Sequence, residues 1–179
     1  MQHRCRVIAF IAVVGAAGAL AGCDDDFVNA LQAPVRVSMR DQCDSASFNA
    51  ALGPGTCSRP GSVTFAEFNN ELNATGRVAS WTFEPTAFVV RLGQAITTQN
   101  NGGEVHTFTE VANFGGGIVP ELNTASGNLV MAPECALLTP SDNVVPGSTF
   151  TTDATTIVGT EHYQCCIHPW MRATVTVIP

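Results

Sequence analysis

The sequence of 179 residues contains no lysine, and its eight basic residues are all arginine. Charged residues make up only 13% of the chain, and the formal net charge is −7. Proteins that bind nucleic acid carry a basic stripe or patch, so this composition excludes nucleic acid as an expected partner. The chain also has no methionine-rich or histidine-rich tract, and no Ser-His-Asp set or carboxylate pair stands out. We therefore expect a protein that is not an enzyme.

The chain lacks an apolar run long enough to span a bilayer. Residues 7–22 are apolar throughout, a length typical of a signal-peptide core. The run ends in Leu-Ala-Gly-Cys, which resembles a bacterial lipobox, so we expect 1–22 to be a signal peptide and Cys23 to carry lipid. An ordinary secretory peptide cut nearby is the alternative. Residues 23–35 are then a lipidated tether, and the protein is expected at the periplasmic face of the inner or outer membrane.

The cysteine count indicates one thiol with a separate task. Of seven cysteines, Cys5 leaves with the signal peptide and Cys23 is lipidated, which leaves five in an oxidising compartment. Two disulfides and one metal-bound thiolate account for this odd number. The remaining cysteines are Cys43, Cys57, Cys135, Cys165 and Cys166.

Residues 36–77 predict a small helical extension. Thr64 and Glu67 form a Thr-x-x-Glu capping box that opens a short helix, and Gly76 can close it. Cys43 and Cys57 stand on either side of a short loop that a disulfide could close. The segment is too small to fold strongly alone, so we expect it to pack on the rest of the chain.

From residue 78 to 179 the pattern changes to many short runs rich in Val, Thr, Ile and Phe, separated by Gly, Pro, Asn and Asp. Such runs predict an all-β sandwich. Residues 113–143 are rich in glycine and proline, and we expect an extended excursion held by Cys135.

The last loop, with the sequence CCIHPWMR, concentrates soft side chains. Cys165, His168 and Met171 have the spacing Cys-x-x-His-x-x-Met. Thiolate and thioether sulfurs favour copper, and a second histidine would complete a His₂Cys set with an axial methionine, the geometry of blue-copper sites. Zinc is a poorer fit, because methionine is not a usual zinc ligand.

Two histidines could complete the set. His106 lies far upstream in a run predicted to be a strand, whereas His162 is three residues before Cys165. Because side chains alternate along a strand, His162 and Cys166 should point away from a metal that Cys165 binds. His106 is therefore preferred. Cys166 is then free to form a disulfide. Four cysteines allow three connectivities, and the favoured one pairs Cys135 with Cys166 and Cys43 with Cys57.

The stretch from Gly159 to Met171 resembles the tail of the cupredoxins, the small blue-copper proteins of plastocyanin and amicyanin type. The Gly turn before His106 and the Pro-Gly turn at 146–147 are similar as well. The resemblance covers about residues 78–179. It implies a Greek-key β-sandwich and one type 1 copper ion held by His106, Cys165, His168 and Met171. Thr107 stands where the family often has asparagine, so it is a candidate to hydrogen-bond the ligand loop.

These observations predict a periplasmic, membrane-anchored carrier of single electrons. Its partner would be a cytochrome or another oxidoreductase that docks transiently. We expect His168 at the solvent edge as the electron port. Trp170 is expected to be packed, and an exposed position near His168 that helps docking is the alternative. The alternatives are a copper chaperone, store or resistance protein, and an accessory copper subunit of a respiratory complex.

Overall fold

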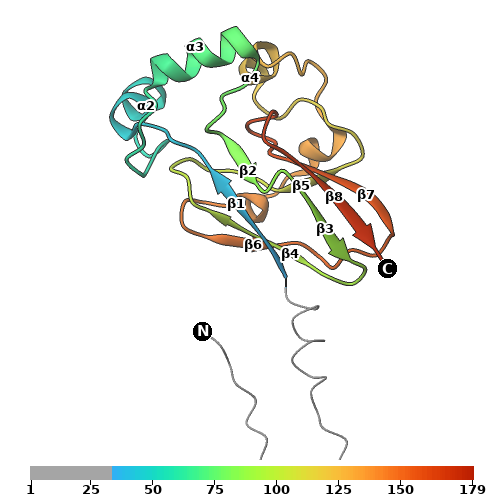
Figure 1. The fold of residues 1–179 in the computed structure, drawn as a ribbon. Coiled ribbons are helices and arrows are strands. Elements are labelled where there is room, and N and C mark those ends of the chain that lie inside the picture. Colours follow the sequence, from blue (N-terminus) through green and yellow to red (C-terminus); the bar gives the residue numbers. More distant parts are fainter. Residues whose placement is uncertain (1–33) are drawn as a thin grey trace, which may run out of the picture.

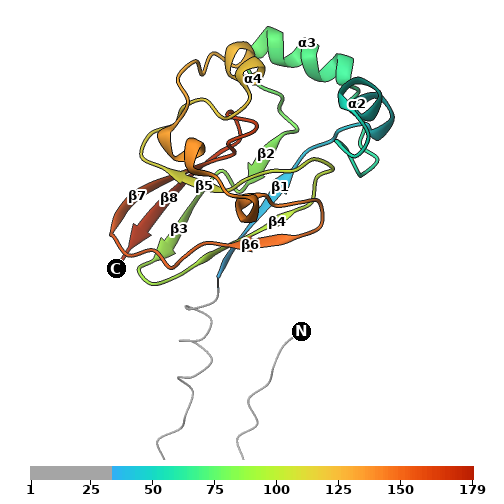
Figure 2. The same cartoon turned by 180° about the vertical axis from the view of Figure 1, so that it is seen from behind.

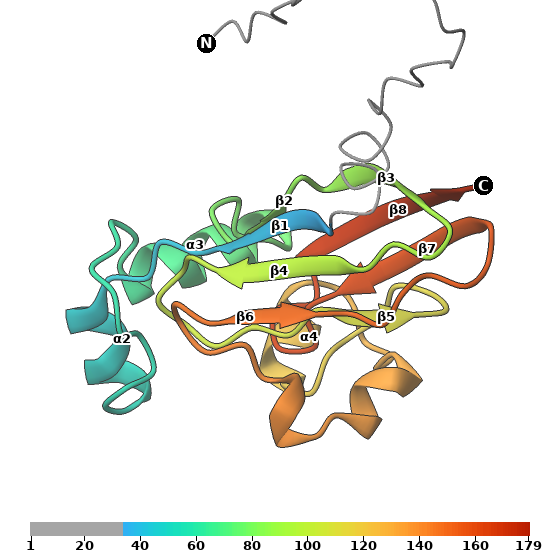
Figure 3. The same ribbon diagram turned by 90° about the horizontal axis from the view of Figure 1, so that it is seen from below.

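The computed structural model describes residues 34–179, so the predicted signal peptide, Cys23 and nearly all of the tether lie outside the described residues. The described chain forms two four-stranded sheets, which Figure 3 shows as two layers. The first sheet has the order β2-β1-β4-β6, and the second has the order β3-β8-β7-β5. The strands of the first sheet are β1 (Val35–Arg40), β2 (Thr82–Glu84), β4 (Ile96–Asn100) and β6 (Thr149–Thr151). Those of the second are β3 (Ala87–Arg91), β5 (Thr109–Val111), β7 (Gly159–Gln164) and β8 (Arg172–Ile178).

The described chain changes sheet at five of its seven strand-to-strand connections, as in a Greek-key sandwich. β1 with β4 and β3 with β8 pair in parallel, and the other neighbours are antiparallel. The all-β sandwich with a small helical extension, predicted from the sequence, is confirmed.

The core lies between the two sheets because apolar side chains alternate along the strands. In β8, Ala173, Val175 and Val177 are buried, and the residues between them are more exposed. In β1, Val37 and Met39 are buried in the same way.

The α-helices gather at one end of the sandwich, away from the C-terminus (Figures 1 and 2). They are α2 (Ser45–Leu52), α3 (Phe65–Thr75) and α4 (Pro120–Ala125). Two 3₁₀ helices, Pro133–Leu137 and Pro140–Asp142, lie apart from this group. The predicted capping box is present, since Thr64 and Glu67 bond each other reciprocally and Gly76 ends α3 with a φ of 74°. Among residues 34–179, no helix combines the length and the apolar character that crossing a bilayer requires.

The first residues of the predicted helical extension instead form a strand of the sandwich. β1 lies between β2 and β4. The remainder of this stretch carries α2 and α3, whose Phe48 and Phe68 pack on Trp81. The extension is thus joined to the core by both a strand and an aromatic cluster.

The excursion at 113–143 contains α4 and the two 3₁₀ helices, and it lies against the last loop. Ile118 donates a backbone hydrogen bond to the carbonyl of Cys166, at 2.6 Å. A disulfide joins Cys135 to Cys166, and another joins Cys43 to Cys57. Both predicted pairings are confirmed.

Candidate metal centre

Cys165 follows β7 directly and is fully buried. It is the free cysteine of the described chain. Two backbone N–H groups, from Thr107 and His168, point at its sulfur at 3.5 Å each. The loop from Cys165 to Met171 closes on itself, because the Cys165 N–H donates to the Met171 carbonyl at 3.0 Å and the Met171 N–H donates to the His168 carbonyl at 2.9 Å. The sulfur therefore has a defined position at the end of the sandwich.

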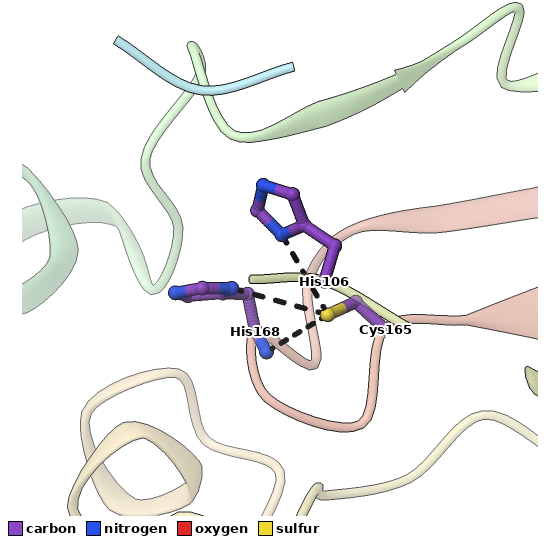
Figure 4. Close-up of side chains that lie close together, drawn as sticks. All are labelled: His106, Cys165 and His168. Atoms are coloured by element: carbon purple, nitrogen blue, oxygen red, sulfur yellow. Dashed lines mark hydrogen bonds between the residues drawn. The ribbon is translucent and has the colours of Figure 1, made fainter. Parts of the chain in front are cut away.

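Two histidines face this sulfur. Nδ1 of His106 and Nδ1 of His168 each lie 3.9 Å from Cys165 Sγ (Figure 4). The ligand atoms of the three residues all lie within 4.8 Å of one another, and all three residues are buried. The structure thus brings together three of the four residues that the sequence assigned to copper, although two of them are about sixty positions apart in the chain.

The separations fit a single metal ion. Bonds of about 2.1 Å to a histidine nitrogen and about 2.3 Å to a cysteine sulfur, the values for zinc, place the two atoms about 3.8 Å apart when the angle between the bonds is about 120°. That angle is the one expected in a trigonal His₂Cys site. Met171, the fourth predicted ligand, is fully buried at the end of the same loop. A donor set of one thiolate and two imidazoles, with a methionine in the same loop, fits copper better than zinc.

The sequence predicted that His106 lies in a regular strand, and this prediction is wrong. It forms an isolated antiparallel bridge with Val144, and β5 begins only at Thr109. The glycine-rich turn before it packs tightly against the segment that follows β1. A side chain at Gly102 would overlap the carboxylate of Asp41.

Asp41 binds the outer nitrogen of His106. Its Oδ2 lies 2.9 Å from His106 Nε2, and both side chains are almost completely buried. Its oxygens also accept backbone N–H bonds from Gly103 and Glu104, at 2.9 and 3.0 Å. Burial acts to raise the pKa of Asp41, but the hydrogen bond and charge of His106, with these N–H groups, lower it to about 2.

Glu104 is close to the outer nitrogen of His168 in a similar way. The distance from Glu104 Oε2 to His168 Nε2 is 3.5 Å, and the same oxygen accepts a hydrogen bond from Trp81 Nε1 at 2.7 Å. Burial acts to lower the pKa of His168, but the Cys165 sulfur and the Glu104 carboxylate raise it to about 10.

The charges around Cys165 favour the thiolate form of its side chain. Burial acts to raise the pKa of Cys165, yet the hydrogen bonds and charges of His106 and His168 bring it well below its ordinary value. The thiolate is the form of cysteine that binds metals. The site therefore favours the ionisation state that a metal ligand needs.

The two residues predicted to support the ligands both touch them. The Thr107 hydroxyl accepts the Cys166 N–H at 2.8 Å, so it bonds the ligand loop as expected. Trp170 is half-buried and lies edge-on to His168, with ring centroids 5.6 Å apart. It also lies near Phe68 of α3, with ring centroids 6.0 Å apart.

The expectation that His168 reaches the solvent edge is wrong. His168 is only 3% exposed. Glu104 lies at its outer nitrogen and Trp170 at its ring edge, and α3 packs against Trp170 through Phe68. The sequence could not show this, because the covering helix comes a hundred residues earlier in the chain.

The strand alternation behaves as predicted. Tyr163 and Cys165 belong to the main core, whereas Cys166 packs with Val111 and Cys135 in a second, smaller cluster. His162, the rejected candidate, lies against the ring of Phe114 instead of the cysteine sulfur.

Asp41 and Glu104 are the residues of the site that the sequence analysis did not identify. One weak signal existed: both are acidic residues close to a predicted site or disulfide residue, Glu104 two positions before His106 and Asp41 two before Cys43. Nothing in the sequence shows that they are buried.

Comparison with known proteins gives similarity in structure only. The chain is similar in fold to cupredoxins. A purple cupredoxin from Nitrosopumilus maritimus has a TM-score of 0.43 and 14% identity, covering 80% of this chain and 99% of that one. A variant plastocyanin of fern has a TM-score of 0.41 and 16% identity, covering 80% and 100%. A reduced amicyanin variant has a TM-score of 0.38 and 24% identity, covering 57% and 78%.

No protein-family model matches the sequence, and no curated protein matches it.

Proposed function

We propose that this chain is an exported, lipid-anchored type 1 copper protein that carries single electrons between redox proteins. The observation that carries the proposal is the buried set of His106, Cys165 and His168, with their three ligand atoms within 4.8 Å of one another. A bound copper ion would supply the one-electron chemistry by changing between Cu(II) and Cu(I).

The protein's part in this chemistry is to keep its ligands still. The Cys165 sulfur accepts two backbone N–H bonds, and each histidine is held between that sulfur and a carboxylate. Ligands fixed by separate contacts move little when the charge of the ion changes. A small structural rearrangement is what rapid electron exchange with a transient partner requires.

Export and anchoring are supported by the sequence and by the disulfides. The apolar run that ends in Cys23 is typical of a lipoprotein signal. Two disulfides are typical of a protein outside the cytoplasm. We place the protein on the periplasmic face of a membrane, with a cytochrome or another oxidoreductase as the redox partner.

The burial of the ligands separates this proposal from copper delivery. A chaperone or resistance protein must pass the ion to another protein, so its ligands need to be accessible. Here Cys165 is fully buried and His168 is 3% exposed. Retention of the ion with exchange of electrons suits such a site better.

The visible spectrum tests the copper assignment. The purified full-length chain is loaded with Cu(II), and we expect intense absorption towards the red that Cys165→Ser abolishes. The matched control is the double variant Cys135→Ala, Cys166→Ala, which removes the neighbouring disulfide and should keep the colour. Colour that depends on Cys166, or none in the parent chain, would contradict the proposal.

The carrier function needs a second measurement. Mixing the copper-loaded chain with a reduced c-type cytochrome in a stopped-flow instrument should bleach the colour, with no copper released. Slow bleaching together with transfer of copper to a competing copper protein would favour the storage or delivery alternative.

A further inference from the structure

Each histidine of the proposed copper site has a buried carboxylate on the side away from the cysteine. Both rings turn Nδ1 towards Cys165, at 3.9 Å. Their Nε2 atoms lie 2.9 Å from Asp41 and 3.5 Å from Glu104. The arrangement therefore has a cysteine in the middle, two histidines around it and one carboxylate behind each histidine.

Neither carboxylate can easily turn away. Asp41 accepts three backbone N–H bonds, from Cys43, Gly103 and Glu104, at 3.2, 2.9 and 3.0 Å. A carboxylate fixed in this way fixes in turn the orientation of the imidazole that it binds. With Asp41 accepting its Nε2–H, His106 is left with Nδ1 as its lone-pair donor.

Glu104 is held by a different partner. Trp81 donates its indole N–H to Glu104 Oε2 at 2.7 Å, and Trp81 is itself buried in the aromatic cluster of the helical extension. The side chain of Glu104 is 9% exposed and that of Asp41 is 1% exposed. Both charges are thus in a region of low dielectric constant, where electrostatic effects are large.

The site has a marked excess of negative charge. When a metal ion takes the place of the proton at Nδ1, both imidazoles are neutral, so the Cys165 thiolate and the two carboxylates leave three negative charges around the ion. Within residues 34–179, the ion pairs of Asp41 and Glu104 are those with the two histidines, and the arginine ion pair is Arg40 with Glu84 at the surface. No arginine of this part of the chain offsets the negative charge at the site.

We propose that Asp41 and Glu104 are positioning residues that orient the two histidines and bias the site towards Cu(II). The inference rests on the proposed copper function. Two effects have the same direction. A buried excess of negative charge stabilises the more positive ion, and a carboxylate bound to the imidazole N–H makes the other nitrogen a stronger donor. The protein therefore has a low reduction potential for a site with these ligands.

Glu104→Gln is the primary test, because glutamine keeps the shape and can still accept the hydrogen bond from Trp81. We expect the variant to retain the colour and to prefer Cu(I) at least tenfold more than the parent chain. For a one-electron couple this is an upward shift of about 59 mV in the midpoint potential. Asp41→Asn is expected to shift the potential in the same direction. Glu121→Gln removes one exposed charge from α4 and is the matched control, with no shift expected.

Trp81→Phe gives a test of opposite sign. It removes the N–H donor from Glu104 but leaves the charge, so the potential should fall. A merely structural role for Glu104 predicts no such reversal between the two variants.

The potential is measured by redox titration of the full-length chain, followed through the absorption of the copper site itself. Any unfolded or empty fraction of a variant therefore does not contribute. If the parent chain is coloured but Glu104→Gln and Asp41→Asn shift the potential no more than Glu121→Gln does, the inference is overturned and the copper function stands. If the parent chain has no colour that depends on Cys165, the proposed function itself fails.

Discussion

The indole of Trp170 lies edge-on to the imidazole of His168, with ring centroids 5.6 Å apart and an angle of 68° between the rings. His168 is consequently almost enclosed, although it lies on a loop at the end of the sandwich. Trp170 also lies near Phe68 of α3, with ring centroids 6.0 Å apart. The helical extension and the ligand loop therefore form one continuous cover over the proposed copper site.

Removing this cover should make the metal accessible. In Trp170→Ala the edge of His168 loses its neighbour, so we expect an excess of a strong copper chelator to bleach the site faster than in the parent chain. Trp170→Phe keeps an aromatic ring at the position and should bleach at nearly the parent rate. Equal rates for the alanine variant and the parent would show that Trp170 does not limit access.

The cover also depends on the first turn of α3. The Thr64 side chain accepts the Glu67 N–H, and Glu67 bonds back to Thr64. Thr64→Ala should lower the free energy of unfolding by about 1 kcal/mol, the usual cost of losing an N-cap. Thr64→Ser preserves the cap and should cost much less. Urea denaturation followed by tryptophan fluorescence measures both, and equal stability of the two variants would contradict the assignment.

Much of this site could be predicted because its ligands are crowded into a short stretch of sequence. Cys165, His168 and Met171 have a recognisable spacing, and strand alternation separated Cys165 from Cys166. The same rule could have identified β1, since Val37 and Met39 alternate with Arg36, Ser38 and Arg40. The prediction instead included residues 36–40 in the helical extension.

The carboxylates and the burial of His168 could not be predicted for a different reason. Asp41 and His106 are 65 residues apart, and Trp81 and Glu104 are 23 apart. Their contacts arise only when β1, the helices and the glycine-rich turn pack together. Sequence patterns reveal the local periodicity of helices and strands, and contacts between residues this far apart leave no such periodic pattern.

The disulfide behind the ligand loop should contribute more to stability than the one in the helical extension. The Cys135–Cys166 bond spans 31 residues and the Cys43–Cys57 bond spans 14. Loop-closure entropy alone gives about 3.7 and about 3.0 kcal/mol for these lengths. In thermal denaturation, the variant Cys135→Ala, Cys166→Ala should therefore lose more stability than the variant Cys43→Ala, Cys57→Ala.

We expect the Cys135–Cys166 disulfide to stabilise the fold without taking part in copper binding. The double alanine variant of the two cysteines lowers stability, whereas Cys165→Ser removes the colour. Loss of colour in the double variant while the chain is still folded, judged by far-ultraviolet circular dichroism, would mean that the disulfide is part of the site.

The sequence-based anchor can be tested independently of the copper. Cys23 lies outside the described residues, and its proposed lipid is the membrane attachment. In the bacterial expression host, the parent chain should sediment with membranes and Cys23→Ala should remain in the soluble fraction. Cys5→Ala, within the predicted signal peptide, is the control and should sediment as the parent does. Sedimentation of the Cys23→Ala chain would refute the anchor.

A group of carboxylates on the second sheet and on the 3₁₀ helix beside it predicts a pH dependence of stability. Burial, together with the charges of Glu161 and Glu134, raises the pKa of Glu110 above its ordinary value of 4.5. Because the folded pKa is the higher one, Glu110 favours the folded state when it is protonated, and this contribution is lost as the pH rises through the folded pKa. At pH 7 the ionised side chain therefore lowers the stability of the fold slightly, by well below 1 kcal/mol, because Glu110 is exposed and solvent screens its charge.

Glu110→Gln should be slightly more stable than the parent at pH 7, and the difference should vanish at about pH 3. Added salt should shrink the gain, and the exposed-charge control Glu121→Gln should show none. A gain that is unchanged from pH 7 to pH 3 would mean that charge repulsion is not its cause.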